Sequence, residues 1–236
     1  MTTLRRVRLV PPSPVPVERV WDRTLRSAAL VSRRKRALDL VVAIGLLVLS
    51  SPIWLIAALT IKFTSPGPIL FRQERIGLDG KPFTCLKFRT MHNGSNDAAH
   101  RELVIRMIEV HDDSHDGKAF KLDRDARIIG PARWLRSTSL DELPQLLNVL
   151  RGEMSIVGPR PPISYELEHY QDWHRERLTV RPGITGLWQV SGRNRLTFNE
   201  MCQLDIRYIH EWSLLSDVRI MVTTPWVMFV DHGGAA

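Results

Sequence analysis

The chain has 236 residues, of which 44% are hydrophobic and 7% are aromatic. This composition allows one domain with a real core and excludes a disordered or fibrous polypeptide. The two cysteines, Cys85 and Cys202, lie far apart, which excludes both a disulfide framework and a cysteine-based zinc site.

The net charge of +8 is concentrated at the N-terminus. Residues 1–36 contain ten basic and two acidic residues, so the rest of the chain is neutral overall. A neutral globular part is a poor binder of nucleic acid, and nucleic acid is therefore not an expected partner. Four prolines and scattered arginines predict that residues 1–31 form a poorly ordered arm.

Residues 32–62 are predicted to enter a membrane. Four basic residues precede the segment 40–61, whose 22 residues carry no charge and approach the length of about 20 needed to cross a bilayer. The segment is too long for a cleavable signal peptide. Ser51 and Pro52 lie in its middle, where the proline removes a backbone hydrogen bond. Because basic residues flank both ends, we favour a re-entrant hairpin, with a proline-kinked spanning helix as the alternative.

Residues 63–236 have the pattern of a mainly helical α/β domain. A short strand is expected at 83–88, and helices are expected at 98–110, 140–150 and 197–212. An apolar segment, whose composition is interrupted by Asp217, Arg219 and Pro225, is expected at 214–230. The acidic loop 111–117 contains His111 and His115 at a spacing that could bind a metal, but its polarity and glycine favour a solvated loop.

The strongest candidate for chemistry is the pair Asp141 and Glu142. With Ser139 they also match a capping box, which would be a purely structural role at a helix start. Two carboxylates can hold Mg²⁺ together with substrate phosphates, and a carboxylate can attack phosphorus. Arginine binds phosphate well. The candidate phosphate-binding residues are Arg136, Arg160, Lys87 and Arg89. Arg181 and Arg193, in a segment rich in glycine and proline, could contact a uridine or a phosphate.

Six blocks in this order carry a resemblance to a known family: residues 35–39, 65–75, 87–91, 138–146, 157–161 and 181–193. The chain resembles the bacterial sugar transferase family, the monotopic polyprenyl-phosphate hexose-1-phosphate transferases. The resemblance covers about residues 33–230. It implies a re-entrant helix bent at Ser51 and Pro52, followed by a cytosolic catalytic domain with amphipathic helices on the membrane surface.

The resemblance also implies a reaction. Asp141 would attack the sugar-bearing phosphate of a UDP-sugar, release UMP and hold a covalent phosphosugar. A polyprenyl phosphate would then accept the sugar-1-phosphate, in the first membrane step of exopolysaccharide synthesis. Glu142 would assist through Mg²⁺, which the pair Asp141 and Glu142 would bind, or through proton handling. Arg136 and Arg160 would bind phosphates. The expected location is the bacterial inner membrane, with the catalytic domain facing the cytoplasm.

Two other functions remain compatible with these residues. One is a membrane-bound, Mg²⁺-dependent phosphohydrolase of nucleotide sugars, in which water replaces the lipid acceptor. The other is a non-enzymatic membrane scaffold whose basic arm binds anionic lipid. The sequence leaves open the identity of the sugar, the length of the lipid and whether the protein forms a homo-oligomer.

Overall fold

The computed structural model describes residues 32–92, 98–109 and 127–230. The predicted arm 1–31 and the acidic loop 111–117 lie outside these ranges. The helices are α2 (Arg33–Leu49), α3 (Ser51–Thr64), α4 (Ala98–Glu109), α5 (Arg133–Ser137), α6 (Gln145–Arg151), α7 (Leu187–Ser191), α8 (Phe198–His210) and α9 (Leu214–Val230). The strands are β1 (Leu70–Ile76), β2 (Pro82–Phe88), β3 (Ser155–Val157) and β4 (Gly183–Thr185).

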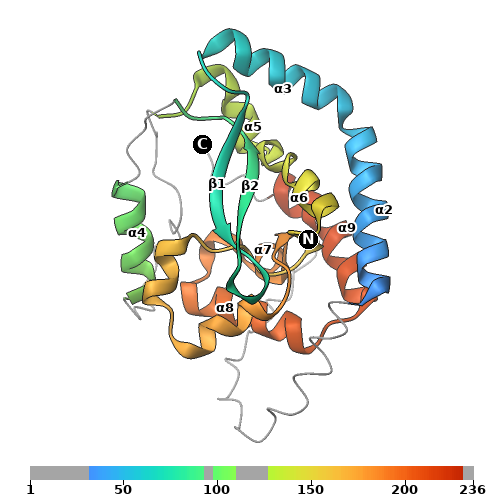
Figure 1. The fold of residues 1–236 in the computed structure, drawn as a ribbon, viewed down its shortest axis with the longest axis vertical. Helices are drawn as coiled ribbons and strands as arrows, with labels where there is room; N and C mark the ends of the chain where they lie inside the picture. The colour runs from blue at the N-terminus through green and yellow to red at the C-terminus, as the bar shows by residue number, and fades with distance from the viewer. Residues whose placement is uncertain (1–31, 93–97, 110–126, 231–236) are drawn as a thin grey trace, which may run out of the picture.

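Helices dominate the structure, and the described strands form two small sheets. The antiparallel hairpin β1–β2 lies at the centre, with α2 and α3 along one side and one end of it (Figure 1). β3 and β4 form a short parallel pair. This mixed architecture agrees with the predicted α/β class, and the predictions at 83–88, 98–110 and 197–212 are confirmed.

One of the predicted helices begins later than expected. The helix expected at 140–150 begins only at Gln145, because residues Leu140–Glu142 form a 3₁₀ turn. The apolar segment predicted at 214–230 is one continuous helix, α9, which contains Pro225. Within this helix, the hydroxyl of Thr224 donates to the carbonyl of Ile220 at 2.7 Å.

The break in the apolar segment lies at Ser50, one residue before the predicted pair Ser51 and Pro52, which begin α3. Pro52 occupies the first turn of α3, where its missing N–H is tolerated. In a continuous helix that N–H would have bonded the carbonyl of Val48. The hydroxyl of Ser51 donates to this carbonyl at 2.8 Å instead, so the broken backbone bond is replaced.

The described helices include none that could cross a membrane alone. α2 and α3 have the necessary length and apolar composition only as a pair, and that pair is bent by 60°. Many of their large apolar side chains are exposed, among them Val41, Val48, Leu49, Leu55 and Phe63.

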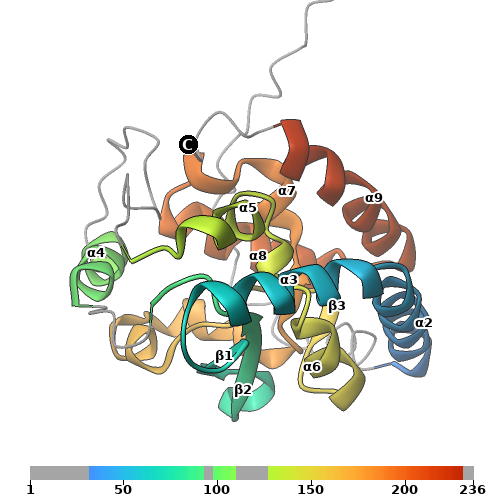
Figure 2. The ribbon, with the colours of Figure 1, turned by 90° about the horizontal axis from the view of Figure 1, so that it is seen from above.

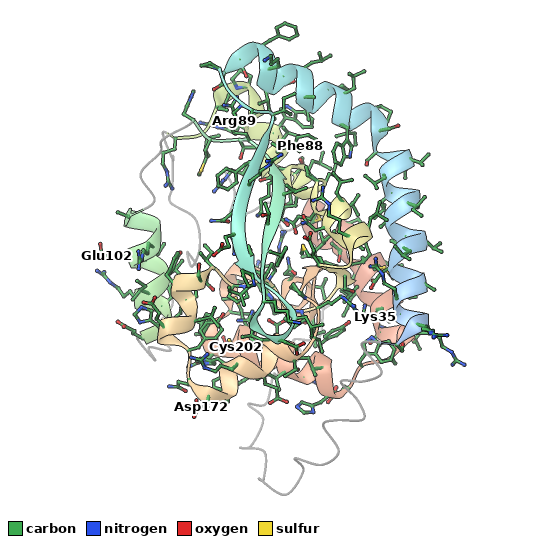
Figure 3. The ribbon with its side chains drawn as sticks, viewed as in Figure 1. Lys35, Phe88, Arg89, Glu102, Asp172 and Cys202 are labelled. Carbon is green, nitrogen blue, oxygen red and sulfur yellow. The ribbon has the colours of Figure 1, made fainter. Side chains whose placement is uncertain are left out.

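Buried charges fasten α2 to the domain. Lys35 pairs with Asp217 of α9 at 2.9 Å and lies 3.5 Å from Asp39, and all three side chains are almost fully buried. Asp39 also accepts hydrogen bonds from the hydroxyl of Ser155 and the N–H of Ile156. The base of α2 is therefore tied to β3 and α9, and Figure 3 shows Lys35 at that end of the helix.

Candidate active site

The hairpin β1–β2 presents one polar face to the site. Gln73 of β1 pairs with Cys85 of β2. Arg75 lies two residues after Gln73 on β1, and Lys87 lies two residues after Cys85 on β2. Because side chains alternate between the faces of a strand, all four lie on the same face. Arg75 was not among the residues predicted from the sequence. The alternation of Gln73 with Arg75, opposite Cys85 and Lys87, is the signal that could have found it.

The carboxylate pair lies in a tight connection between two helices. Ser139 follows α5 with φ of 56°, a left-handed conformation that is costly for a residue with a side chain. Its side chain makes no capping hydrogen bond, so the capping box is wrong, and Pro144 stands at the N-cap of α6. Asp141 and Glu142 therefore lie in the 3₁₀ turn just before α6.

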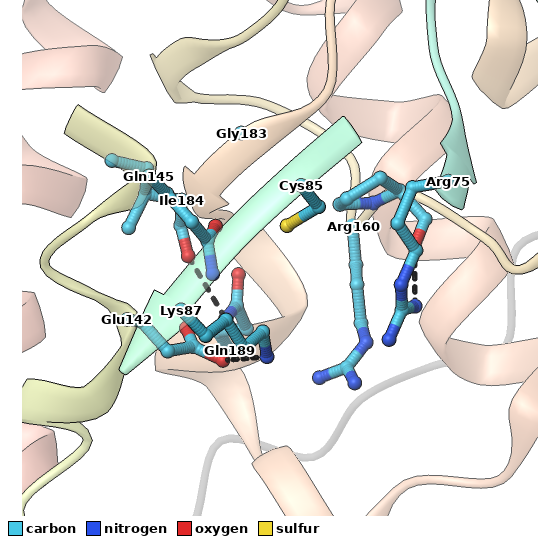
Figure 4. A pocket seen from close by; sticks show the side chains of 10 residues that line it. Arg75, Cys85, Lys87, Glu142, Gln145, Arg160, Gly183, Ile184 and Gln189 are labelled. Atoms are coloured by element: carbon cyan, nitrogen blue, oxygen red, sulfur yellow. Dashed lines mark hydrogen bonds and ion pairs between the residues drawn. The ribbon is translucent and has the colours of Figure 1, made fainter. Parts of the chain in front are cut away.

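Glu142 is the carboxylate that faces the polar pocket (Figure 4). The ammonium of Lys87 lies 2.8 Å from its Oε1. Arg75 and Arg160 line the same pocket, together with Cys85 and other residues of β2, α6, α7 and β4. The pocket therefore has three cationic side chains against one carboxylate, which favours an anionic ligand.

The loop that carries Arg160 is held from two sides. Arg75 donates to the carbonyl of Pro161 at 2.8 Å, and the N–H of Ile76 donates to the carbonyl of Pro162 at 2.9 Å. On the other side, buried Arg177 donates to the carbonyl of Arg160 at 3.4 Å and pairs with Asp205 at 2.7 Å. The backbone is fixed while the Arg160 side chain stays exposed, an arrangement suited to binding a ligand.

Gly158 allows this loop to leave β3 in close contact with β4. A Cβ atom at Gly158 would lie 2.6 Å from the carbonyl oxygen of Arg181. Any side chain at this position would therefore displace the backbone that precedes Arg160.

The two adjacent carboxyls differ in their electrostatic surroundings. Burial raises the pKa of Asp141 to about 6, with Glu142 adding to the rise and Lys87 opposing it. Burial would also raise the pKa of Glu142, but Lys87, Arg160 and Arg75 together hold it below its usual value. Among the described residues, Asp141 has no ion-pair partner, whereas Glu142 has Lys87.

The structure brings some of the predicted residues together and sets one apart. Lys87, Glu142 and Arg160 share the pocket, and Arg136 of α5 is close enough to Asp141 to lower its pKa. Arg89 is buried at the far end of the hairpin, near α3 (Figure 3). It donates to the carbonyls of Ser65 and Pro66 at 2.8 and 2.6 Å, so it supports the end of α3.

A second cavity, of about 300 Å³, adjoins the polar pocket. Its walls are mostly apolar residues of α2, α6 and α9, and Glu142, Ile184 and Gln189 line both cavities. Glu142 therefore stands between a cationic pocket and an apolar one.

The donor set at the carboxylate pair fits a magnesium ion only in combination with a ligand. Within the described residues, no group of three or more histidine, cysteine or acidic side chains is placed to hold a metal. Mg²⁺ needs only one or two carboxylates when substrate phosphates complete its shell, so Asp141 and Glu142 fit a substrate-dependent site.

A pocket in which three cationic side chains converge beside one carboxylate, Glu142, is typical of enzymes that act on phosphate groups. The comparison with known proteins agrees, because the profile of the bacterial sugar transferase family matches residues 30–231. The chain therefore belongs to the bacterial sugar transferase family, and it is an enzyme of that transferase class.

Several curated relatives are similar over most of this chain. The exopolysaccharide production protein ExoY of Sinorhizobium fredii is 43% identical over 200 residues, which cover 80% of this chain and 83% of the relative. The UDP-glucose:undecaprenyl-phosphate glucose-1-phosphate transferase of Caulobacter vibrioides is 42% identical over 211 residues, which cover 86% of this chain and 72% of the relative. The galactosyl transferase CpsE of Streptococcus agalactiae is 44% identical, but the match spans only 36% of its length.

Proposed function

We propose that this protein transfers a sugar-1-phosphate from a UDP-sugar to a polyprenyl phosphate, giving a polyprenyl-diphosphate-sugar and UMP. The observation that carries the proposal is the contrast between two adjacent carboxylates. Buried Asp141 has no ion-pair partner among the described residues, whereas Glu142 is paired with Lys87 beside Arg75 and Arg160. The names of relatives as undecaprenyl-phosphate transferases of galactose or glucose-1-phosphate support the reaction class.

The cations would bind the diphosphate of the donor. Lys87 and Arg160 can contact phosphate oxygens, and the loop that carries Arg160 is fixed. Arg75 adds positive charge to the same pocket. An Asp141 oxygen would attack the sugar-bearing phosphorus, and the bond from that phosphorus to the UMP oxygen would break. An oxygen of the lipid phosphate would then attack the same phosphorus and release Asp141 as a carboxylate.

Asp141 is the better nucleophile of the pair. A raised pKa reflects a more basic oxygen, and no ion pair within the described residues withdraws its charge. Glu142 is held as an anion by Lys87 and is better suited to orient that lysine and to stabilise bound charge. Arg136 is placed to assist Asp141 through its positive charge.

Mg²⁺ fits this site as a cofactor that would be held by Asp141, Glu142 and the phosphates of the donor. When bound, it would supply charge neutralisation to the diphosphate.

The acceptor is a membrane lipid, so the enzyme must work at a membrane surface. We infer that the bent pair α2 and α3 enters the bacterial inner membrane as a re-entrant hairpin, supported by its exposed apolar side chains and its bend of 60°. The catalytic domain would face the cytoplasm, where nucleotide sugars are made. α9, with Leu215, Val222 and Trp226 exposed, is suited to lie on the membrane surface.

The decisive test is UMP release by the full chain with Mg²⁺ and undecaprenyl phosphate across a panel of UDP-sugars. We expect UMP and lipid-linked sugar in equal amounts with at least one donor. Many turnovers of UMP release without lipid would show a phosphohydrolase instead. Mass spectrometry of the protein quenched during turnover should find the phosphosugar on the peptide that contains Asp141, and a label on Glu142 alone would overturn the assignment.

A further inference from the structure

The apolar cavity beside the polar pocket lies between α2 and α9. These helices lie side by side, and the pair Lys35–Asp217 ties their bases together (Figure 2). Further along, the two helices contribute Val42, Leu46, Met221 and Met228 to the cavity. Residues of α6 and β3 also line it. The walls offer apolar contact over most of their surface.

The lining of this cavity also includes polar residues. Glu142, Ser139, Thr185 and Thr224 line it together with Arg193. Arg193 has φ of 49°, a strained conformation for a residue with a side chain, and such strain is concentrated at functional positions. Within the described part of the chain, the Arg193 guanidinium has no carboxylate partner. A cation therefore stands in a mostly apolar cavity that Glu142 also lines.

We infer that this cavity binds the acceptor, with the first isoprene units of its tail between α2 and α9 and its phosphate at Arg193. The inference rests on the proposed function and assigns the acceptor a position separate from Lys87, Arg75 and Arg160. An amphiphilic occupant, with an anionic head and an apolar tail, fits the mostly apolar walls and Arg193, because the one lining carboxylate, Glu142, is already paired with Lys87. Because Glu142 lines both cavities, a phosphate at Arg193 would lie in the cavity that adjoins the donor pocket.

The surface around the cavity supports a lipid that arrives from the side. Leu46 lines the cavity and is 39% exposed, while Val41 of α2 and Val222 and Trp226 of α9 expose apolar surface outside it. A volume of about 300 Å³ is at the lower limit of small-molecule sites, so it encloses only part of a long chain. The rest of the tail would continue along this apolar surface into the bilayer.

Two cavity variants with matched controls test the assignment. Met221→Trp fills the cavity, and Glu102→Trp adds the same side chain to an exposed position on α4. Arg193→Gln removes the cation, Arg193→Lys retains it, and Arg195→Gln changes a neighbouring exposed arginine. Each variant is assayed for the KM of undecaprenyl phosphate, and for the exchange of labelled UMP into UDP-sugar, which needs no lipid.

We expect Met221→Trp and Arg193→Gln to raise the KM for undecaprenyl phosphate about tenfold or more, with exchange within about twofold of the parent protein. Arg193→Lys should recover part of the loss, and both control variants should match the parent. An unchanged KM for undecaprenyl phosphate in the two cavity variants would overturn the inference. This includes the case in which the variants change only the activation of the enzyme by phosphatidylglycerol vesicles.

Photolabelling separates this inference from the proposed function. A photoreactive isoprenyl phosphate should label the peptides of α6 and α9 that line the cavity, and Met221→Trp should abolish the label. Labelling confined to other segments would overturn the inference even if transfer is observed. If the parent protein shows neither exchange nor transfer, the proposed function fails, while cavity labelling would still identify an isoprenyl-phosphate site.

Discussion

Two buried groups of charged side chains in this protein differ in how completely they are paired with other protein groups. At the base of α2, Lys35 meets Asp39 and Asp217, and Asp217 also accepts hydrogen bonds from Tyr208 and Trp212 at 2.7 and 3.1 Å. In the active site, cations outnumber the carboxylates that face them, and Asp141 has no ion-pair partner among the described residues.

The difference shows which group serves the architecture and which serves a ligand. A buried charge is tolerated when protein groups pair with it, as they do at the base of α2. Burying an incompletely paired charge costs less free energy when a ligand supplies the missing charge. Until a ligand binds, the group lowers the stability of the fold. The four predictions below test this contrast, from the largest expected effect to the smallest.

Asp141→Asn should have the largest effect, a loss of transfer of about 10³-fold or more, because the nucleophile is removed. The same variant should be more stable than the parent protein at pH 7. Asp141 binds its proton more tightly in the folded state, so ionising it costs stability that Asn avoids. With a pKa of about 6 in place of 3.8, the gain is about 2–3 kcal/mol.

Urea unfolding of the two proteins as a function of pH checks this second effect. The advantage of Asp141→Asn should be fully present above about pH 6, shrink as the pH falls and vanish below about pH 4. Equal stability at pH 7 would contradict the unpaired state of Asp141.

Asp217→Asn should act in the opposite way, because it leaves the buried Lys35 without its closest partner. We expect a loss of about 3 kcal/mol in the free energy of unfolding, since breaking a buried ion pair strands the remaining charge. Protein that remains folded should keep its donor KM. Thermal unfolding together with donor kinetics measures both quantities, and Lys35→Met combined with Asp217→Leu should recover much of the stability.

The pH dependence of the first chemical step should reflect the raised pKa of Asp141. The attacking carboxylate must be ionised, so the rate of UMP–UDP-sugar exchange should fall about tenfold per pH unit below about pH 6. Glu142 stays ionised in this range because its pKa is lowered. A rate that is flat down to pH 5 would contradict the assignment of Asp141 as the nucleophile.

Two arginine substitutions should separate ligand binding from support of the fold. Arg160→Lys should raise the donor KM about tenfold, because lysine cannot bind phosphate in the bidentate manner of arginine. Arg89→Lys should leave the donor KM unchanged and lower stability by about 1–2 kcal/mol, because it loses bonds to the carbonyls of Ser65 and Pro66. A higher donor KM in Arg89→Lys would restore the phosphate-binding role predicted from the sequence.

The sequence was informative wherever the pattern is local. The uncharged run with Ser51 and Pro52 predicted the bend near α3, and the short strand expected at 83–88 is β2. The pair Asp141 and Glu142 was found because two adjacent carboxylates before a helix are visible within a few residues. The capping box was wrong because Ser139 adopts a left-handed conformation, which its residue type does not reveal.

The sequence by itself determined the family, the bend between α2 and α3 and the carboxylate pair, since these depend on short motifs. Only the tertiary structure brought Arg75 into the site, moved Arg89 out of it and opened an apolar cavity between α2 and α9. These features depend on strand register and on packing between segments more than a hundred residues apart. Such contacts are decided by which faces can be buried together, and no local pattern records them.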